Sequence, residues 1–111
     1  MVQRLGATLS RGRASLPEGV EPLRIPRAGE TMVWLPGPRA LVSGDRLLGD
    51  GEGGVRLCPA TWLRYLRPGL TLDELRGALA PLLDLPVERI LVSHGEPVLR
   101  DGRAALERAL S

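Results

Sequence analysis

Hydrophobic positions in the first part of the chain occur as short apolar runs between Gly- and Pro-rich turns, a pattern typical of β-strands. Residues 31–35 and 40–43 flank the turn 36–39 (PGPR), so they predict an antiparallel hairpin. Residues 20–26 predict a further strand. Pro22 suits an edge position there, because proline cannot donate a ladder hydrogen bond.

The later hydrophobic positions follow helical spacing. Thr71 and Glu74 form a capping-box pattern, and leucines at 72, 75, 79, 82 and 83 continue it, so a helix is predicted over 71–85. Pro81 should kink this helix or start a second short one. Residues 58–66 predict a short helix with Trp62, Leu63 and Leu66 on one face, and residues 102–110 a last helix with Asp101 as its N-cap.

Between these helices, the apolar run 90–92 predicts a buried strand over 88–93, at the centre of the sheet. Together the elements predict an α+β fold, a mixed or antiparallel sheet with helices packed on one face. A chain of 111 residues fits a single domain, 1–111, in which 1–19 form a poorly defined lead-in with a short strand over 2–9.

Three glycines, Gly49, Gly51 and Gly54, match the spacing G-x-G-x-x-G of dinucleotide-binding loops. No helical pattern follows to place a helix N-terminus at the phosphates, and Asp50 and Glu52 would repel them. Residues 47–54 are therefore predicted to be a flexible surface loop.

Composition adds little about function. All 15 basic residues are arginine, and Lys, Asn and Phe are absent, which either GC-rich coding or selection against thermolabile Asn would produce. The net charge is +2; residues 1–29 hold five Arg and two Glu, whereas the remainder holds ten Arg and eleven acids. No basic helix face interleaved with aromatic residues is evident, which argues against nucleic-acid binding.

Cys58 is the only cysteine, so no internal disulfide can form, which fits a cytoplasmic protein. Its neighbours Leu57 and Pro59 favour a buried, unreactive thiol. The N-terminal residues lack the apolar core of a signal peptide, and no run is long enough to span a membrane.

Asp45 and His94 are the residues whose positions favour chemistry. Each lies just after a predicted strand, in a Gly-flanked turn, and each side chain is a ligand type that zinc accepts. The alternatives are structural, because Asp commonly forms turns and a lone histidine is usually not a ligand.

Several motifs in order resemble the C-terminal half of the metallo-β-lactamase fold: residues 29–31 (GET), 40–45 (ALVSGD), 92–97 (VSHGEP) and 102–104 (GRA). The resemblance covers about residues 20–110. It implies one half of an αββα sandwich, in which Asp45 would bridge two metals and His94 would be a late metal ligand.

The family's H-x-H-x-D-H motif is absent, and Pro26 stands where a further histidine often precedes the Gly-Glu-Thr strand. A catalytic zinc needs three protein ligands, and Glu96 could become a third only by a geometry that the family does not predict.

Two hypotheses follow. The chain is a non-catalytic half-domain that associates with itself or with a complementary protein chain, with no cofactor of its own. Alternatively, it is part of a metal-dependent hydrolase whose remaining zinc ligands come from a partner or from preceding sequence.

Overall fold

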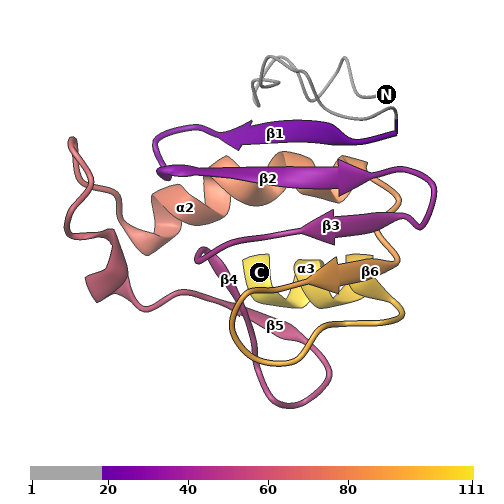
Figure 1. The fold of residues 1–111 in the computed structure, drawn as a ribbon. Coiled ribbons are helices and arrows are strands. Elements are labelled where there is room, and N and C mark those ends of the chain that lie inside the picture. The colour runs from indigo at the N-terminus through magenta and orange to yellow at the C-terminus, as the bar shows by residue number, and fades with distance from the viewer. Residues whose placement is uncertain (1–18) are drawn as a thin grey trace.

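The computed structural model describes residues 19–111, so the strand predicted over 2–9 lies outside the described part of the chain. A four-stranded sheet, in the order β1-β2-β3-β6, organises the fold (Figure 1). Its strands are β1 (Glu21–Ile25), β2 (Glu30–Leu35), β3 (Ala40–Val42) and β6 (Arg89–Leu91). The first three are antiparallel neighbours, which confirms the predicted hairpin, and β1 lies at one end of the sheet. Among residues 19–111, Pro22 therefore lies in an outer strand, as predicted.

The strand predicted at the centre of the sheet is at its other end. β6 pairs in parallel with β3, and on its other side the described residues add only an isolated bridge between Ile90 and Val98. It is also shorter than predicted. The prediction of burial holds for Ile90, which is fully buried, whereas Leu91 is 37% exposed and Val92 is partly buried. An apolar run specifies neither burial on both faces nor a strand's place in the sheet.

Residues 47–54 contradict the prediction of a flexible surface loop. β4 (Leu47–Gly49) and β5 (Val55–Leu57) form a second, two-stranded sheet, and Leu47 and Leu48 are buried. The turn between them is closed by Asp50, whose Oδ1 accepts hydrogen bonds from the backbone N–H groups of Glu52 and Gly54. The element that follows these glycines is a strand and not a helix. This agrees with the expectation that no helix N-terminus stands here to bind the phosphates of a dinucleotide.

The predicted capping box is confirmed at the start of α2 (Leu72–Leu79). The Thr71 hydroxyl accepts the N–H of Glu74 at 3.1 Å, and the Glu74 carboxylate accepts the N–H of Thr71 at 3.0 Å. At Pro81 the α-helix gives way to a 3-10 helix, η2 (Ala80–Asp84), as the missing N–H predicts.

Two helix predictions need correction. Between 58 and 66 only a 3-10 turn forms, η1 (Ala60–Leu63), and Trp62 is exposed instead of sharing the buried face of Leu63 and Leu66. Asp101 precedes α3 (Gly102–Leu110), but its backbone is left-handed and its side chain makes no cap hydrogen bond.

Helices α2 and α3 lie behind the four-stranded sheet, on the same face (Figure 1). The core fills the space between them. Its central side chains are all fully buried: Leu23, Met32, Leu41 and Ile90 from the sheet, with Leu75, Leu79, Leu82 and Leu106 from the helical side. The predicted α+β fold with helices on one face is confirmed. No helix in residues 19–111 is long and apolar enough to cross a membrane.

The opposite face of the sheet carries a row of apolar side chains. The strand register aligns Pro22, Val33, Val42 and Leu91 across all four strands. Because successive residues of a strand point to opposite faces, these side chains point away from the core residues that alternate with them. Within the described residues, no helix covers this row.

The loop after β6 packs closely against β4. The N–H of Gly49 donates to the carbonyl of His94 at 2.9 Å. A Cβ atom at Gly49 would lie 2.5 Å from the carbonyl oxygen of Glu96, and Gly95 has a positive φ of 88°. Gly49 therefore serves close backbone packing, which positions the His94 turn.

Replacing Gly49 by alanine should displace this turn. We expect a destabilisation of about 1–3 kcal/mol, because the new methyl group meets backbone atoms that cannot rotate away. Urea unfolding measures the change in stability, and the NMR shifts of the His94 ring report the displacement.

Gly77→Ala is the matched control. A Cβ atom there meets nothing within 4 Å, and the residue lies within α2, so this variant should gain up to about 1 kcal/mol. Equal stability of the two variants would show that the close approach at Gly49 is unimportant.

Candidate functional site

The parallel pairing of β3 and β6 brings Asp45 and His94 together. Val42 and Leu91 are register partners, and Asp45 and His94 each follow their strand's last residue by three positions. Because parallel strands end at the same edge of a sheet, the two turns emerge side by side. A hydrogen bond from the N–H of Ser43 to the carbonyl of Leu91, at 2.9 Å, continues the pairing beyond the strands.

The two side chains are in direct contact. His94 Nε2 lies 3.2 Å from Asp45 Oδ1, although the residues are 49 positions apart. Both remain open to water, with side chains 56% and 61% exposed. The Ser93 hydroxyl donates to the same carboxylate oxygen at 3.5 Å, a weak contact.

Glu30 holds the turn that carries Asp45. Its carboxylate accepts the N–H groups of Gly44 and Arg46, each at 3.1 Å. A Cβ atom at Gly44 would lie 2.9 Å from Glu30 Oε1, so any larger residue there would displace the carboxylate. Burial raises the pKa of Glu30, against the lowering effect of the two backbone hydrogen bonds.

The buried side chain of Arg46 connects the turn that carries Asp45 to neighbouring segments. Its Nε donates to the carbonyl of Ala28 at 2.8 Å, and its Nη2 donates to the Tyr65 hydroxyl at 2.5 Å. Its Nη1 lies 3.4 Å from the carbonyl of Trp62 and 3.6 Å from Cys58 Sγ. The thiol is itself buried, as the sequence predicted.

Trp62 flanks His94 on the exposed side. The ring centroids are 5.8 Å apart with an interplanar angle of 71°, an edge-on contact. The imidazole is thus held by Asp45 and by Trp62. Its orientation is defined even though more than half of the side chain is exposed.

Asp45 and His94 do not complete a zinc site. A catalytic zinc needs three protein ligands, and within residues 19–111 no three His, Cys, Asp or Glu side chains gather closely enough to hold a metal. The described residues therefore do not fit the metal centre that the family resemblance implies.

Nor does the pair extend to a hydrolytic triad. A nucleophile would have to be hydrogen-bonded to His94, whereas Ser93 donates to Asp45. In the described arrangement, the Asp45 carboxylate can orient the His94 imidazole, and the pair can accept a proton or a cation. Both side chains remain accessible to water.

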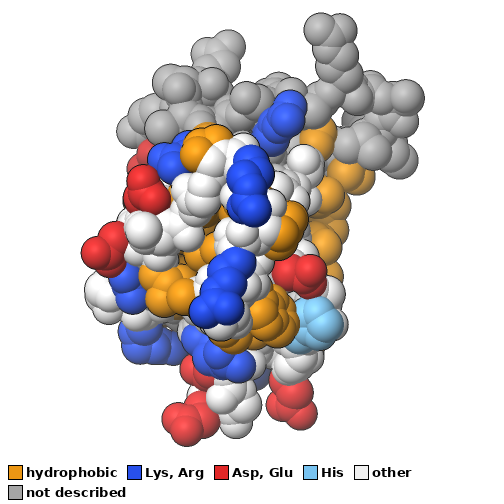
Figure 2. Space-filling model, turned by 90° about the vertical axis from the view of Figure 1, so that its left-hand side faces the viewer, with side chains coloured by type: hydrophobic (Ala, Val, Ile, Leu, Met, Phe, Trp, Pro, Cys, Tyr) orange, Lys and Arg blue, Asp and Glu red, His pale blue; other side chains and the backbone are white. Residues whose placement is uncertain are grey.

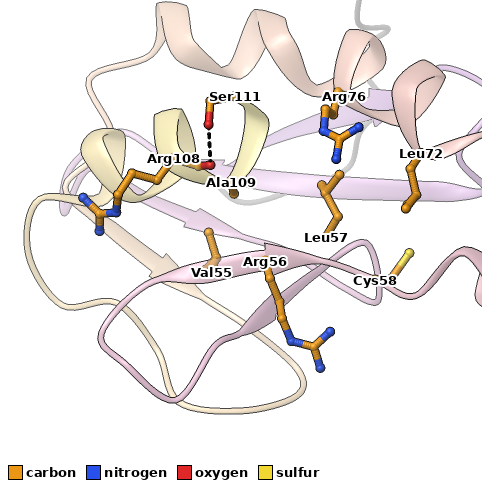
Figure 3. Close-up of a pocket in the computed structure, with 9 residues that line it drawn as sticks. All are labelled: Val55, Arg56, Leu57, Cys58, Leu72, Arg76, Arg108, Ala109 and Ser111. Carbon is orange, nitrogen blue, oxygen red and sulfur yellow. Dashed lines mark hydrogen bonds between the residues drawn. The ribbon is translucent and has the colours of Figure 1, made fainter.

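A separate pocket of about 400 Å³ lies between β5, α2 and the end of α3 (Figure 3). In the close-up Arg76 points towards Leu57, whereas Arg56 points away from the helices. Neither Asp45 nor His94 lines this pocket. It is therefore distinct from the pair at the sheet edge.

Sequence reasoning identified Asp45 and His94 but missed the residues that hold them. Glu30 stands in the Gly-Glu-Thr motif, yet nothing in the sequence marks its carboxylate as a backbone acceptor. Arg46 gives no signal at all, because arginine is usually exposed. Glu96 does not join Asp45 and His94 in a metal-binding group within residues 19–111.

No protein-family model matches the chain, and the search of curated proteins returned no significant match.

The raised pKa of Glu30 predicts a specific pH dependence. The folded state binds the Glu30 proton more tightly than the unfolded chain, whose pKa is near 4.5. The contribution of Glu30 to stability is therefore largest below pH 4.5 and falls as pH rises through the folded pKa. In Glu30→Gln this decline should disappear, as measured by urea unfolding between pH 4 and 8.

Glu30→Ala is the companion variant, because it removes both acceptors. It should cost about 1–3 kcal/mol by leaving the N–H groups of Gly44 and Arg46 without the carboxylate. An unchanged pH profile in Glu30→Gln would contradict the assignment of the decline to this residue.

Proposed function

We propose that this protein is a metallo-β-lactamase-like half-domain that lacks a complete metal site and is non-catalytic on its own. The contact between Asp45 and His94 at the ends of parallel strands carries this proposal. It is the arrangement that the family resemblance implies for these residues. The lack of a third ligand within residues 19–111 supports a degenerate site.

The proposal includes association with a second copy or with a complementary protein chain. Its support is the apolar row of Pro22, Val33, Val42 and Leu91, on the sheet face that no described helix covers. Figure 2 shows hydrophobic side chains along its right-hand margin, the side that faces the viewer in Figure 1. In an αββα sandwich this face would be buried against the sheet of the other half.

A second candidate function is that of a subunit or fragment of a metal-dependent hydrolase. The direct contact of two potential ligands favours it, because a partner, or an in-frame segment encoded before Met1, would need to add the missing ligands beside them. Asp45 and His94 would then bind zinc. For either candidate we propose a cytoplasmic location, since the lone Cys58 is compatible with a reducing compartment.

Disrupting the apolar row should abolish association. We expect the purified protein to sediment as a dimer and Val33→Arg to sediment as a monomer, because a charge in the middle of the row would be desolvated on association. Analytical ultracentrifugation across a concentration series measures this change.

Ala80→Arg is the matched control, since Ala80 is exposed beyond α2 on the helical side. It introduces the same side chain and should leave the dimer intact. A wild-type protein that stays monomeric would contradict self-association, and co-purification with one stoichiometric protein would favour the complementary chain.

Metal content tests the degenerate site. Protein purified without chelators and then incubated with zinc should retain far less than one zinc per chain, because two ligands bind zinc weakly. Mass spectrometry of the metal content measures retention after dialysis. Stoichiometric zinc that is lost in His94→Ala would refute the non-catalytic half-domain and favour the hydrolase subunit.

A further inference from the structure

Two aromatic side chains are exposed on one irregular segment of the surface. Trp62 in η1 is 38% exposed, and Tyr65 just beyond it is 64% exposed. Arg64 and Arg67, in the same segment, are also exposed. We call Trp62, Arg64, Tyr65 and Arg67 the aromatic–arginine surface. Figure 2 looks onto this side of the molecule, where a line of blue side chains runs beside hydrophobic ones and the histidine.

Each ring contacts a residue of the neighbouring turns: Tyr65 contacts the buried Arg46, and Trp62 contacts the exposed His94. Arg46 donates to the Tyr65 hydroxyl, and its guanidinium lies 5.6 Å from the centre of the Tyr65 ring. His94 contacts Trp62 edge-on. A ring whose position is already fixed loses little side-chain entropy on binding, so each is suited to stacking against a ligand.

The charges around the rings are predominantly positive. Arg67 Nη1 donates to two backbone carbonyls, those of Arg64 and Leu66, and so uses no carboxylate there. Arg27 joins the same surface, because its Nη2 donates to the carbonyl of Gly69 at 3.0 Å while its Nη1 pairs with Glu74. Folding thus gathers arginines that are distant in sequence, a patch that the sequence pattern did not reveal.

We infer that the aromatic–arginine surface binds single-stranded nucleic acid. Bases stack on Trp62 and Tyr65, and backbone phosphates contact Arg64 and Arg67. Fixed, exposed rings beside arginines are the combination that sequence-tolerant single-strand binders use. An acidic peptide would satisfy the arginines but has no flat base for each ring. This inference uses a different surface from the apolar row and does not depend on the proposed function.

A fluorescein-labelled 12-mer of deoxythymidine is the direct probe, with binding followed by anisotropy and by intrinsic tryptophan fluorescence. Trp34 is only 3% exposed, so quenching by the oligonucleotide reports on Trp62. We expect saturable binding that weakens with salt, with a log–log slope of about −0.7 for each phosphate contacted.

Trp62→Leu should abolish the quenching and weaken binding roughly 5- to 100-fold, the loss expected for one stacked base. Arg64→Gln and Arg67→Gln should each weaken binding and reduce the magnitude of the salt slope by about 0.7. Arg100→Gln removes an exposed arginine outside this surface and should change neither quantity. Circular dichroism confirms that each variant is folded.

Inorganic polyphosphate and poly-glutamate separate stacking from charge. Each should bind far more weakly than the oligonucleotide and quench no tryptophan fluorescence. Polyphosphate binding as tight as that of the oligonucleotide would overturn the inference, and tight poly-glutamate binding would do so in favour of an acidic protein partner. Equal losses in Arg100→Gln and Arg64→Gln would also overturn it, because binding would then be diffuse.

Discussion

The burial of Arg46 is the constraint on which the functional edge of this protein depends. Arg46 as a residue is 2% exposed, so its guanidinium loses its hydration and must recover hydrogen bonds from the protein. The carbonyls of Ala28 and Trp62, the Tyr65 hydroxyl and the Cys58 sulfur provide them. These partners come from the turn after β1, from η1 and the residues just after it, and from the residue that follows β5. One side chain therefore fixes three segments that have little regular hydrogen bonding of their own, and Glu30 fixes the backbone of Arg46 at the same time.

Two surfaces derive their order from this arrangement. The turn whose N–H groups Glu30 accepts carries Asp45 to His94. The hydrogen bonds of Arg46 to Tyr65 and Trp62 hold these two residues at the surface beside that turn. The pair of Asp45 and His94 is therefore in direct contact with the aromatic–arginine surface, through the rings of His94 and Trp62. The apolar row on the sheet is separate, since it arises from strand alternation alone. Association through the row and ligand binding at the rings would not compete for the same residues.

The candidate pair could be identified from sequence, whereas its support could not. Asp45 and His94 each follow an apolar run and a small residue, and local patterns of this kind are visible in one dimension. Their contact depends on the parallel register of β3 and β6, which are separated by two strands and three helical segments. Glu30 holds the turn by accepting hydrogen bonds from backbone N–H groups, and Arg46 holds it through a buried, charged side chain. Residue type points the other way for both, because Glu and Arg are normally solvated.

The local sequence determined the hairpin of β2 and β3, the capping box of α2 and the helix change at Pro81. Each depends on the backbone preferences of a few adjacent residues, so each could be predicted without the fold. Only the tertiary structure decided that Leu47–Gly49 is a buried strand, that Arg89–Leu91 ends the sheet, and that Trp62 is exposed. These outcomes depend on which distant segments pack together. Hydrophobicity alone indicates that a segment is buried and does not indicate its neighbour.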